Sequence, residues 1–92
     1  MRLPSSRELK KIRDVRQFPV CRVTWVDSCS CSRWRDVDQV RGETLMECQT
    51  VGFLVSRTRR SLVLAQSVNE NRDLAASWVV PTAGVKRVER LR

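Results

Sequence analysis

The chain has 92 residues, of which 41% are hydrophobic and 30% are charged, a balance typical of one small globular domain. Its net charge of +8 comes mostly from arginine, which favours partners that bear phosphates or carboxylates. The chain has no histidine, which excludes nucleophile–histidine pairs and most metal-hydrolase sites.

The N-terminus is predicted to be a basic helix and linker spanning residues 1–19, ahead of the folded domain. Ser5 and Glu8 have the spacing of a capping box, so we expect a helix over residues 5–16. It should stop before Phe18 and Pro19, because the residue before a proline is disfavoured in a helix. Its one thin apolar stripe requires it to dock on the rest of the chain or to fray.

Residues 20–92 are predicted to form a small all-β barrel. β-branched runs and turn residues alternate at short, regular intervals, which is typical of such folds. Alternation places Cys21, Val23 and Trp25 on the core face of the first strand. The expected strands are residues 20–27, 47–58, 61–68, 77–81 and 85–91.

The segments between these strands are also informative. Residues 28–43 form a long irregular segment with a helical turn near residues 35–40, and loops of this length are usually functional or mobile. Gly52, inside the second strand, indicates a bulge or bend. Residues 69–76 are predicted to be a polar loop, and residues 82–84 fit one turn of 3₁₀ helix.

A leading helix followed by five short strands resembles the Sm-like and SH3-like barrels. The strand segments 52–55, 62–64, 79–80 and 85–88 resemble strands two to five of the Sm pattern. Known Sm-like RNA binders place an acid, a stacking residue and an asparagine around the turn between strands two and three. Here that turn is residues 57–61, Arg-Thr-Arg-Arg-Ser, which has no stacking ring and argues against uridine stacking in a ring pore.

A second resemblance rests on the segments Val23–Ser28, Val51–Val55 and Leu62–Ser67. They look like small bacteriophage- and prophage-encoded proteins of unassigned role. The resemblance implies a barrel and a phage origin, with the cytoplasm of a bacterial host as the location. The absence of an apolar run near the roughly 20 residues of a membrane span, and of a signal-peptide core, also favours a cytosolic protein with no membrane partner.

The cysteines permit a zinc site only as a weak alternative. The pair Cys29 and Cys31 has one intervening residue, whereas zinc knuckles usually have two to four. Cys21 and Cys48 fall in strands, where cysteine often acts as a small buried hydrophobe. We therefore expect no metal and no cofactor.

The tryptophans differ in context. Trp25 and Trp78 occupy strand positions at core spacing, which favours packing. Trp34 lies in the long segment between two arginines, which suits a protein interface or base stacking, or a lid over one end of the barrel.

Basic residues gather at a second place, the hairpin after the second strand, where three of four residues are arginine. Together with basic residues of the N-terminal helix they can form one surface, although solvated turns are often basic as well. The candidate binding residues are Lys10, Lys11, Arg13, Arg33, Trp34, Arg35, Arg57, Arg59 and Arg60.

No catalytic constellation accompanies these residues, so the sequence predicts no enzyme. The favoured function is a non-catalytic phage-encoded protein that engages a host protein or nucleic acid through its arginine-rich face. The alternative is an Sm-like homo-oligomer that binds RNA or a nucleotide.

Overall fold

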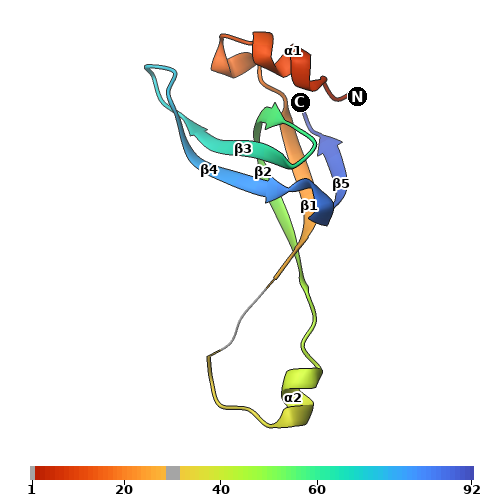
Figure 1. Cartoon of the computed structure of the whole chain (residues 1–92). Helices are drawn as coiled ribbons and strands as arrows, with labels where there is room; N and C mark the ends of the chain where they lie inside the picture. The colour runs from red at the N-terminus through yellow and green to blue at the C-terminus, as the bar shows by residue number, and fades with distance from the viewer. Residues whose placement is uncertain (1, 29–31) are drawn as a thin grey trace.

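The computed structural model describes residues 2–28 and 32–92. It is mainly β, with five antiparallel strands in one sheet of order β4-β3-β2-β1-β5 and a short helix across one end of the sheet (Figure 1). This confirms the predicted fold class at that level. The sheet is open, since no ladder among the described strands joins β4 to β5, so the predicted closed barrel is not confirmed. The strands are β1 (Val20–Asp27), β2 (Met46–Arg57), β3 (Ser61–Val68), β4 (Leu74–Pro81) and β5 (Val85–Arg90).

The N-terminal helix α1 (Ser6–Lys11) begins with the predicted capping box. The Glu8 amide donates to Ser5 Oγ at 3.1 Å and the Ser5 amide donates to Glu8 Oε1 at 3.2 Å. The helix is shorter than predicted because Asp14 starts a new turn, accepting from the Arg16 amide at 3.0 Å. That turn is the 3₁₀ helix η1 (Val15–Gln17).

One hydrophobic core joins the sheet to the N-terminal segment. Leu9 of α1 and Phe18 are buried in the same cluster as the inward-facing residues of the strands. The predicted core face of β1 is confirmed, because its three residues are at most 5% exposed. The cluster consists of Leu9, Phe18, Cys21, Val23, Trp25, Leu54, Leu62, Leu64 and Val80.

Gly52 has a different role from the one predicted. The register shift between β2 and β3 falls between Leu54 and Ser56 rather than at Gly52. A Cβ on Gly52 would lie 2.7 Å from the Ala65 carbonyl oxygen. The glycine therefore permits a close approach of two strand backbones, and the bulge comes a few residues later.

The hairpin between β3 and β4 is tighter than the predicted polar loop. Asn69 Oδ1 accepts from the Asp73 amide at 2.9 Å, and Arg72 takes a positive φ of 66°. This side-chain closure lets β4 begin at Leu74 instead of residue 77. The predicted 3₁₀ turn is confirmed as η2 (Thr82–Gly84), which leads into β5.

Trp78 is not the core residue that its strand position predicted. It pairs with buried Leu64 and is two residues from buried Val80, yet 49% of its surface is exposed. Its strand is the edge of an open sheet, so no further strand covers the ring.

Opposite α1, the segment between β1 and β2 projects away from the sheet (Figure 1). We call residues 32–46, which end with the first residue of β2, the arm. The predicted helical turn is present there as α2 (Val37–Arg41), which begins with a capping box between Asp36 and Gln39. The arm makes the molecule elongated, with extents of 52 × 27 × 20 Å. In the described ranges, no helix is long and apolar enough to cross a membrane.

Candidate binding surfaces

A shallow hollow of about 450 Å³ lies between α1 and the turn from β2 to β3. Two segments far apart in sequence supply its wall, and three of the wall residues are basic. The sheet core holds these segments together, because Leu9 of α1 packs in the same cluster as the strands. The lining residues are Ser6, Lys10, Arg57, Thr58 and Arg59.

Many arginines of this chain have structural partners, which limits how much of the charge is free to bind. Arg57 donates to the Pro4 carbonyl oxygen at 3.0 Å, and Arg90 donates to the Arg2 carbonyl oxygen at 2.8 Å. Arg92 donates to the carbonyl oxygens of Arg16 and Phe18, each at 3.1 Å. These bonds fasten the N-terminal segment to the sheet.

Five other basic residues of the N-terminal segment and the β2–β3 turn are not held in this way within the described residues. Over residues 2–28 and 32–92, none of Lys10, Lys11, Arg13, Arg59 and Arg60 forms an ion pair, and all five are exposed. Unpaired, exposed charges produce the positive potential that attracts an anionic partner. We call Lys10, Lys11, Arg13, Arg57, Arg59 and Arg60 the basic end.

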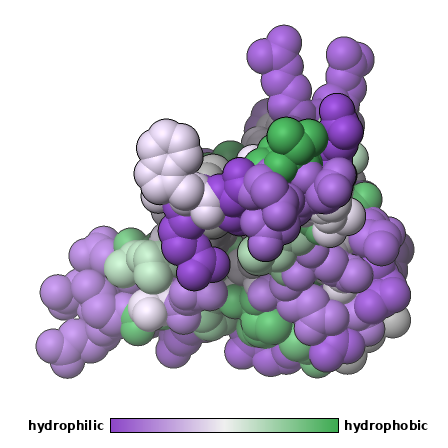
Figure 2. All heavy atoms as spheres, turned by 90° about the horizontal axis from the view of Figure 1, so that it is seen from below, coloured by the Kyte–Doolittle hydropathy of each residue, from purple (hydrophilic) through white to green (hydrophobic). Residues whose placement is uncertain are grey.

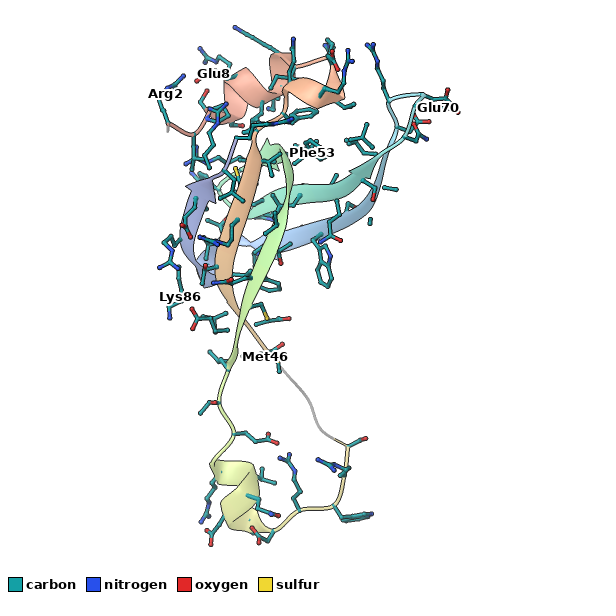
Figure 3. All side chains as sticks on the ribbon, turned by 180° about the vertical axis from the view of Figure 1, so that it is seen from behind. Arg2, Glu8, Met46, Phe53, Glu70 and Lys86 are labelled. Atoms are coloured by element: carbon teal, nitrogen blue, oxygen red, sulfur yellow. The ribbon has the colours of Figure 1, made fainter. Side chains whose placement is uncertain are left out.

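The acids beside α1 are already engaged by other arginines. Arg2 donates to both carboxylate oxygens of Glu8, and Figure 3 shows the two residues side by side. These hydrogen bonds are the main cause that lowers the pKa of Glu8 to about 2. Hydrogen bonds from Arg16 likewise lower the pKa of Asp14 to about 2. Both carboxylates are therefore ionised at neutral pH without neutralising the basic end.

The predicted trio Arg33, Trp34 and Arg35 lies on the arm, apart from the basic end. Trp34 is fully exposed. Arg35, which precedes α2, forms an ion pair with Glu43, which follows it. The nine predicted binding residues thus divide between the arm and the basic end, and the hollow brings Lys10 together with Arg57 and Arg59.

The structure also separates the cysteines. Cys21 is fully buried, and burial raises the pKa of its thiol. Its cross-strand partner is Gly52, four positions along β2 from Cys48, a distance of about 13 Å at roughly 3.3 Å per residue. Since zinc–sulfur bonds are about 2.3 Å long, Cys21 and Cys48 cannot bind the same ion. Cys29 and Cys31 lie outside the described residues.

The sequence pattern did not reveal the apolar surface of the arm and of β4. Val37, Val40, Leu45 and Met46 are each at least half exposed, as is Val79 on β4. Figure 2, which views the molecule from below, shows hydrophobic patches between hydrophilic side chains. The spacing of Val37, Val40 and Leu45 is visible in the sequence. Such a spacing is normally interpreted as an amphipathic segment that buries its apolar side against its own domain, so it did not predict an exposed apolar surface.

Comparisons with known proteins place this chain in no family: no family model, curated protein or solved structure matches it.

Proposed function

We propose that this chain is a non-catalytic binding protein whose basic end engages the phosphates of a nucleic acid. The observation that carries the proposal is the set of exposed cations, without ion pairs in the described chain, on the N-terminal segment and the β2–β3 turn. Two of them, Lys10 and Arg59, line the same hollow. The Ser6 hydroxyl in the same wall adds a group of a kind that commonly donates to phosphate oxygens, whereas the Thr58 hydroxyl already donates to the Ser61 carbonyl oxygen at 3.3 Å. The phage resemblance, which makes a bacterial host the source of this partner, remains a prediction.

The expected mode of binding is electrostatic and largely independent of sequence. Phosphate contacts supply most of non-specific affinity, and released counterions make that affinity fall steeply with salt. The absence of a stacking ring from the β2–β3 turn fits contact with the backbone rather than with bases. An acidic protein is the competing partner, because carboxylates also pair with arginine.

The test is a binding titration of single- and double-stranded oligonucleotides against wild type and two matched double variants. Arg59→Glu with Arg60→Glu should weaken binding at low salt by orders of magnitude while leaving it measurable. Lys86→Glu with Arg87→Glu makes the same change in net charge on β5, and Figure 3 shows Lys86 at the end of the sheet away from α1. This control should weaken binding far less.

Salt dependence gives a second measure of the same interaction. The slope of log affinity against log salt should become shallower by about 0.9 for each phosphate that the protein no longer neutralises. The slope of the Arg59 and Arg60 variant should therefore be shallower by about twice this amount. Equal weakening by both double variants would point to net charge alone. Failure of wild type to bind any oligonucleotide at low salt would reject nucleic acid and leave an acidic protein as the partner.

The alternative function is the Sm-like oligomer, and one observation favours it. Both edges of the sheet, β4 and β5, are unpaired in the described chain, and Trp78 and Val79 are exposed on β4. Edge strands pair readily with another copy, and head-to-tail pairing of β4 with β5 closes a ring. A stable hexamer or similar ring in solution, lost on Val79→Lys, would support this reading.

The predicted SH3-like or Sm-like barrel stays a proposal of its own, whichever function holds. Register shifts at Thr24/Trp25 and Leu54/Ser56 bend strands as barrel corners do. The three-residue turn η2 brings the end of β4 to the start of β5. These features support an SH3-like or Sm-like curvature. An experimental structure would test barrel closure by the presence or absence of hydrogen bonds between β4 and β5 of the same chain.

A further inference from the structure

The arm has a surface that its own domain does not use. None of the residues of α2 is buried, and α2 lies beyond the far end of the sheet from α1 (Figure 1). Isolated helices this short are unstable in water, so local contacts must hold it. The capping box and the Arg35–Glu43 ion pair provide them. The conformation of α2 therefore rests on these local contacts and not on burial against the sheet.

Its exposed residues are those that dominate protein interfaces. Trp34 is fully exposed, and four aliphatic or methionine side chains of the arm are each at least half exposed. A single tryptophan offers roughly 150–250 Å² of contact area, and tryptophan and arginine are enriched among the residues that carry binding energy. A standard interface needs about 800 Å² from each partner, so the tryptophan alone is too small and its exposed apolar neighbours must also be covered.

The charge of the arm is compatible with a second copy of this chain as its partner. The arm contains three arginines and three acids (Arg33, Arg35, Arg41, Asp36, Asp38 and Glu43), so its net charge is zero. The whole net charge of +8 therefore belongs to the rest of the chain. Two copies repel each other through their bodies, and the arm is the region where they can meet without that repulsion.

An open hollow lies at the base of the arm. Ser28, Glu43, Thr44 and Leu45 border this hollow of about 460 Å³. Hollows of this size accept drug-sized molecules, so there is room for an indole ring. In a two-fold dimer, a residue that contacts a surface of the partner has its own copy of that surface contacted by the partner's equivalent residue.

We propose that the chain forms a two-fold homodimer through its arms, with Trp34 of each copy packed against the Leu45 side of the other arm. The bodies then lie at opposite ends of the dimer. The inference does not depend on nucleic-acid binding, since the interface lies at the other end of the molecule from the basic end.

Sedimentation velocity of nuclease-treated full chain, from about 1 to 100 µM, tests the proposal. Wild type should move from monomer to dimer with concentration, and Trp34→Ala should weaken dimerisation at least about tenfold. Val40→Asp should do the same by placing a charge in the apolar contact. Trp78→Ala is the matched control, because this tryptophan is exposed but lies on β4, and it should leave the dimer unchanged.

The alternatives give different results. A wild type that stays monomeric throughout would overturn the dimer and leave the arm to a different protein. An oligomer that resists Trp34→Ala but dissociates on Val79→Lys would also overturn it, since assembly would then run through the sheet edge. Circular dichroism of each variant guards against misfolding, and Trp34→Ala should melt as wild type does because the side chain contacts no core residue.

Discussion

The arm and the rest of the chain, which we call the body, contain similar residues but are stabilised by different interactions. Leucine, valine, tryptophan and arginine occur in both. In the body, Leu54, Leu64 and Val80 are fully buried, and hydrophobic burial provides the stability. In the arm, apolar side chains remain in water, and a capping box with one ion pair gives the shape. Burial therefore stabilises the body, whereas local contacts shape the arm and leave its apolar side chains exposed.

The body and the arm should respond differently to the same substitution, and leucine gives the largest contrast. Leu64 is fully buried, whereas Leu45 is 68% exposed. Leu64→Ala should lower the free energy of unfolding by about 2–5 kcal/mol, a large part of the stability of a small domain. Leu45→Ala should change it by less than about 0.5 kcal/mol. Urea denaturation at low protein concentration measures both; similar losses would show that the arm is part of the cooperative core.

Glycine provides a second matched pair. A Cβ at Gly52 would meet the Ala65 carbonyl oxygen at 2.7 Å, whereas at Gly42 the nearest atom is 3.4 Å away. Gly52→Ala should destabilise the protein by about 1–3 kcal/mol, as overpacking does. Gly42 has an ordinary φ of −80°, so Gly42→Ala should be neutral or raise stability by up to about 1 kcal/mol. A shift in melting temperature of the same sign for both would contradict this difference.

Removing a buried hydrogen bond within the body should have a smaller effect on stability. Trp25 Nε1 donates to Thr50 Oγ1 at 3.0 Å across β1 and β2. Thr50→Val keeps the side-chain shape but leaves the indole donor buried without an acceptor, at a cost of about 1–2 kcal/mol. Thr50→Ser keeps the acceptor and should cost less. If Val and Ser are equally tolerated in thermal melts, the hydrogen bond contributes no net stability.

Acid should weaken the body by the smallest amount. The pKa of Glu8 falls from 4.5 in the unfolded chain to about 2 in the fold, chiefly through the Arg2 hydrogen bonds. Its contribution is present above about pH 4.5 and is lost as the pH falls towards 2, because the unfolded chain binds the proton first. Glu8→Gln retains a capping-box residue and should flatten this loss. The free energy of unfolding of both proteins, measured as a function of pH, checks this prediction. The same slope for Glu8→Gln as for wild type would contradict it.

The sequence predicted the body better than the arm because burial leaves a periodic pattern. Alternation placed Cys21, Val23 and Trp25 in the core, and Ser5 with Glu8 located the start of α1. Errors arose where a single residue changed the backbone: Asp14 restarted the helix, and the Asn69 side chain closed a hairpin that looked like a loop. The exposure of Trp78 depends on whether the sheet closes, which no local pattern reports.

The candidate site was predictable only in part, for the same reason. The arginine-rich turn was visible, but its meeting with α1 depends on how Leu9 packs. The sequence also does not reveal that Arg57 is engaged by the Pro4 carbonyl oxygen or that Arg35 pairs with Glu43. Trp34 was identified as a contact residue, whereas the separation of the arm from the basic end required the three-dimensional fold.

The two ends of the chain lie close together beside α1 (Figure 1), and this placement governs how the protein yields to mechanical force. Near the ends, β1 and β5 are antiparallel partners, with Cys21 opposite Arg90. Tension applied to both ends would first detach Arg90 and Arg92 from the N-terminal segment. It would then open the ladder one hydrogen bond at a time, like a zipper, instead of shearing all bonds together. The molecule should therefore unravel at low force along this axis, whatever its equilibrium stability.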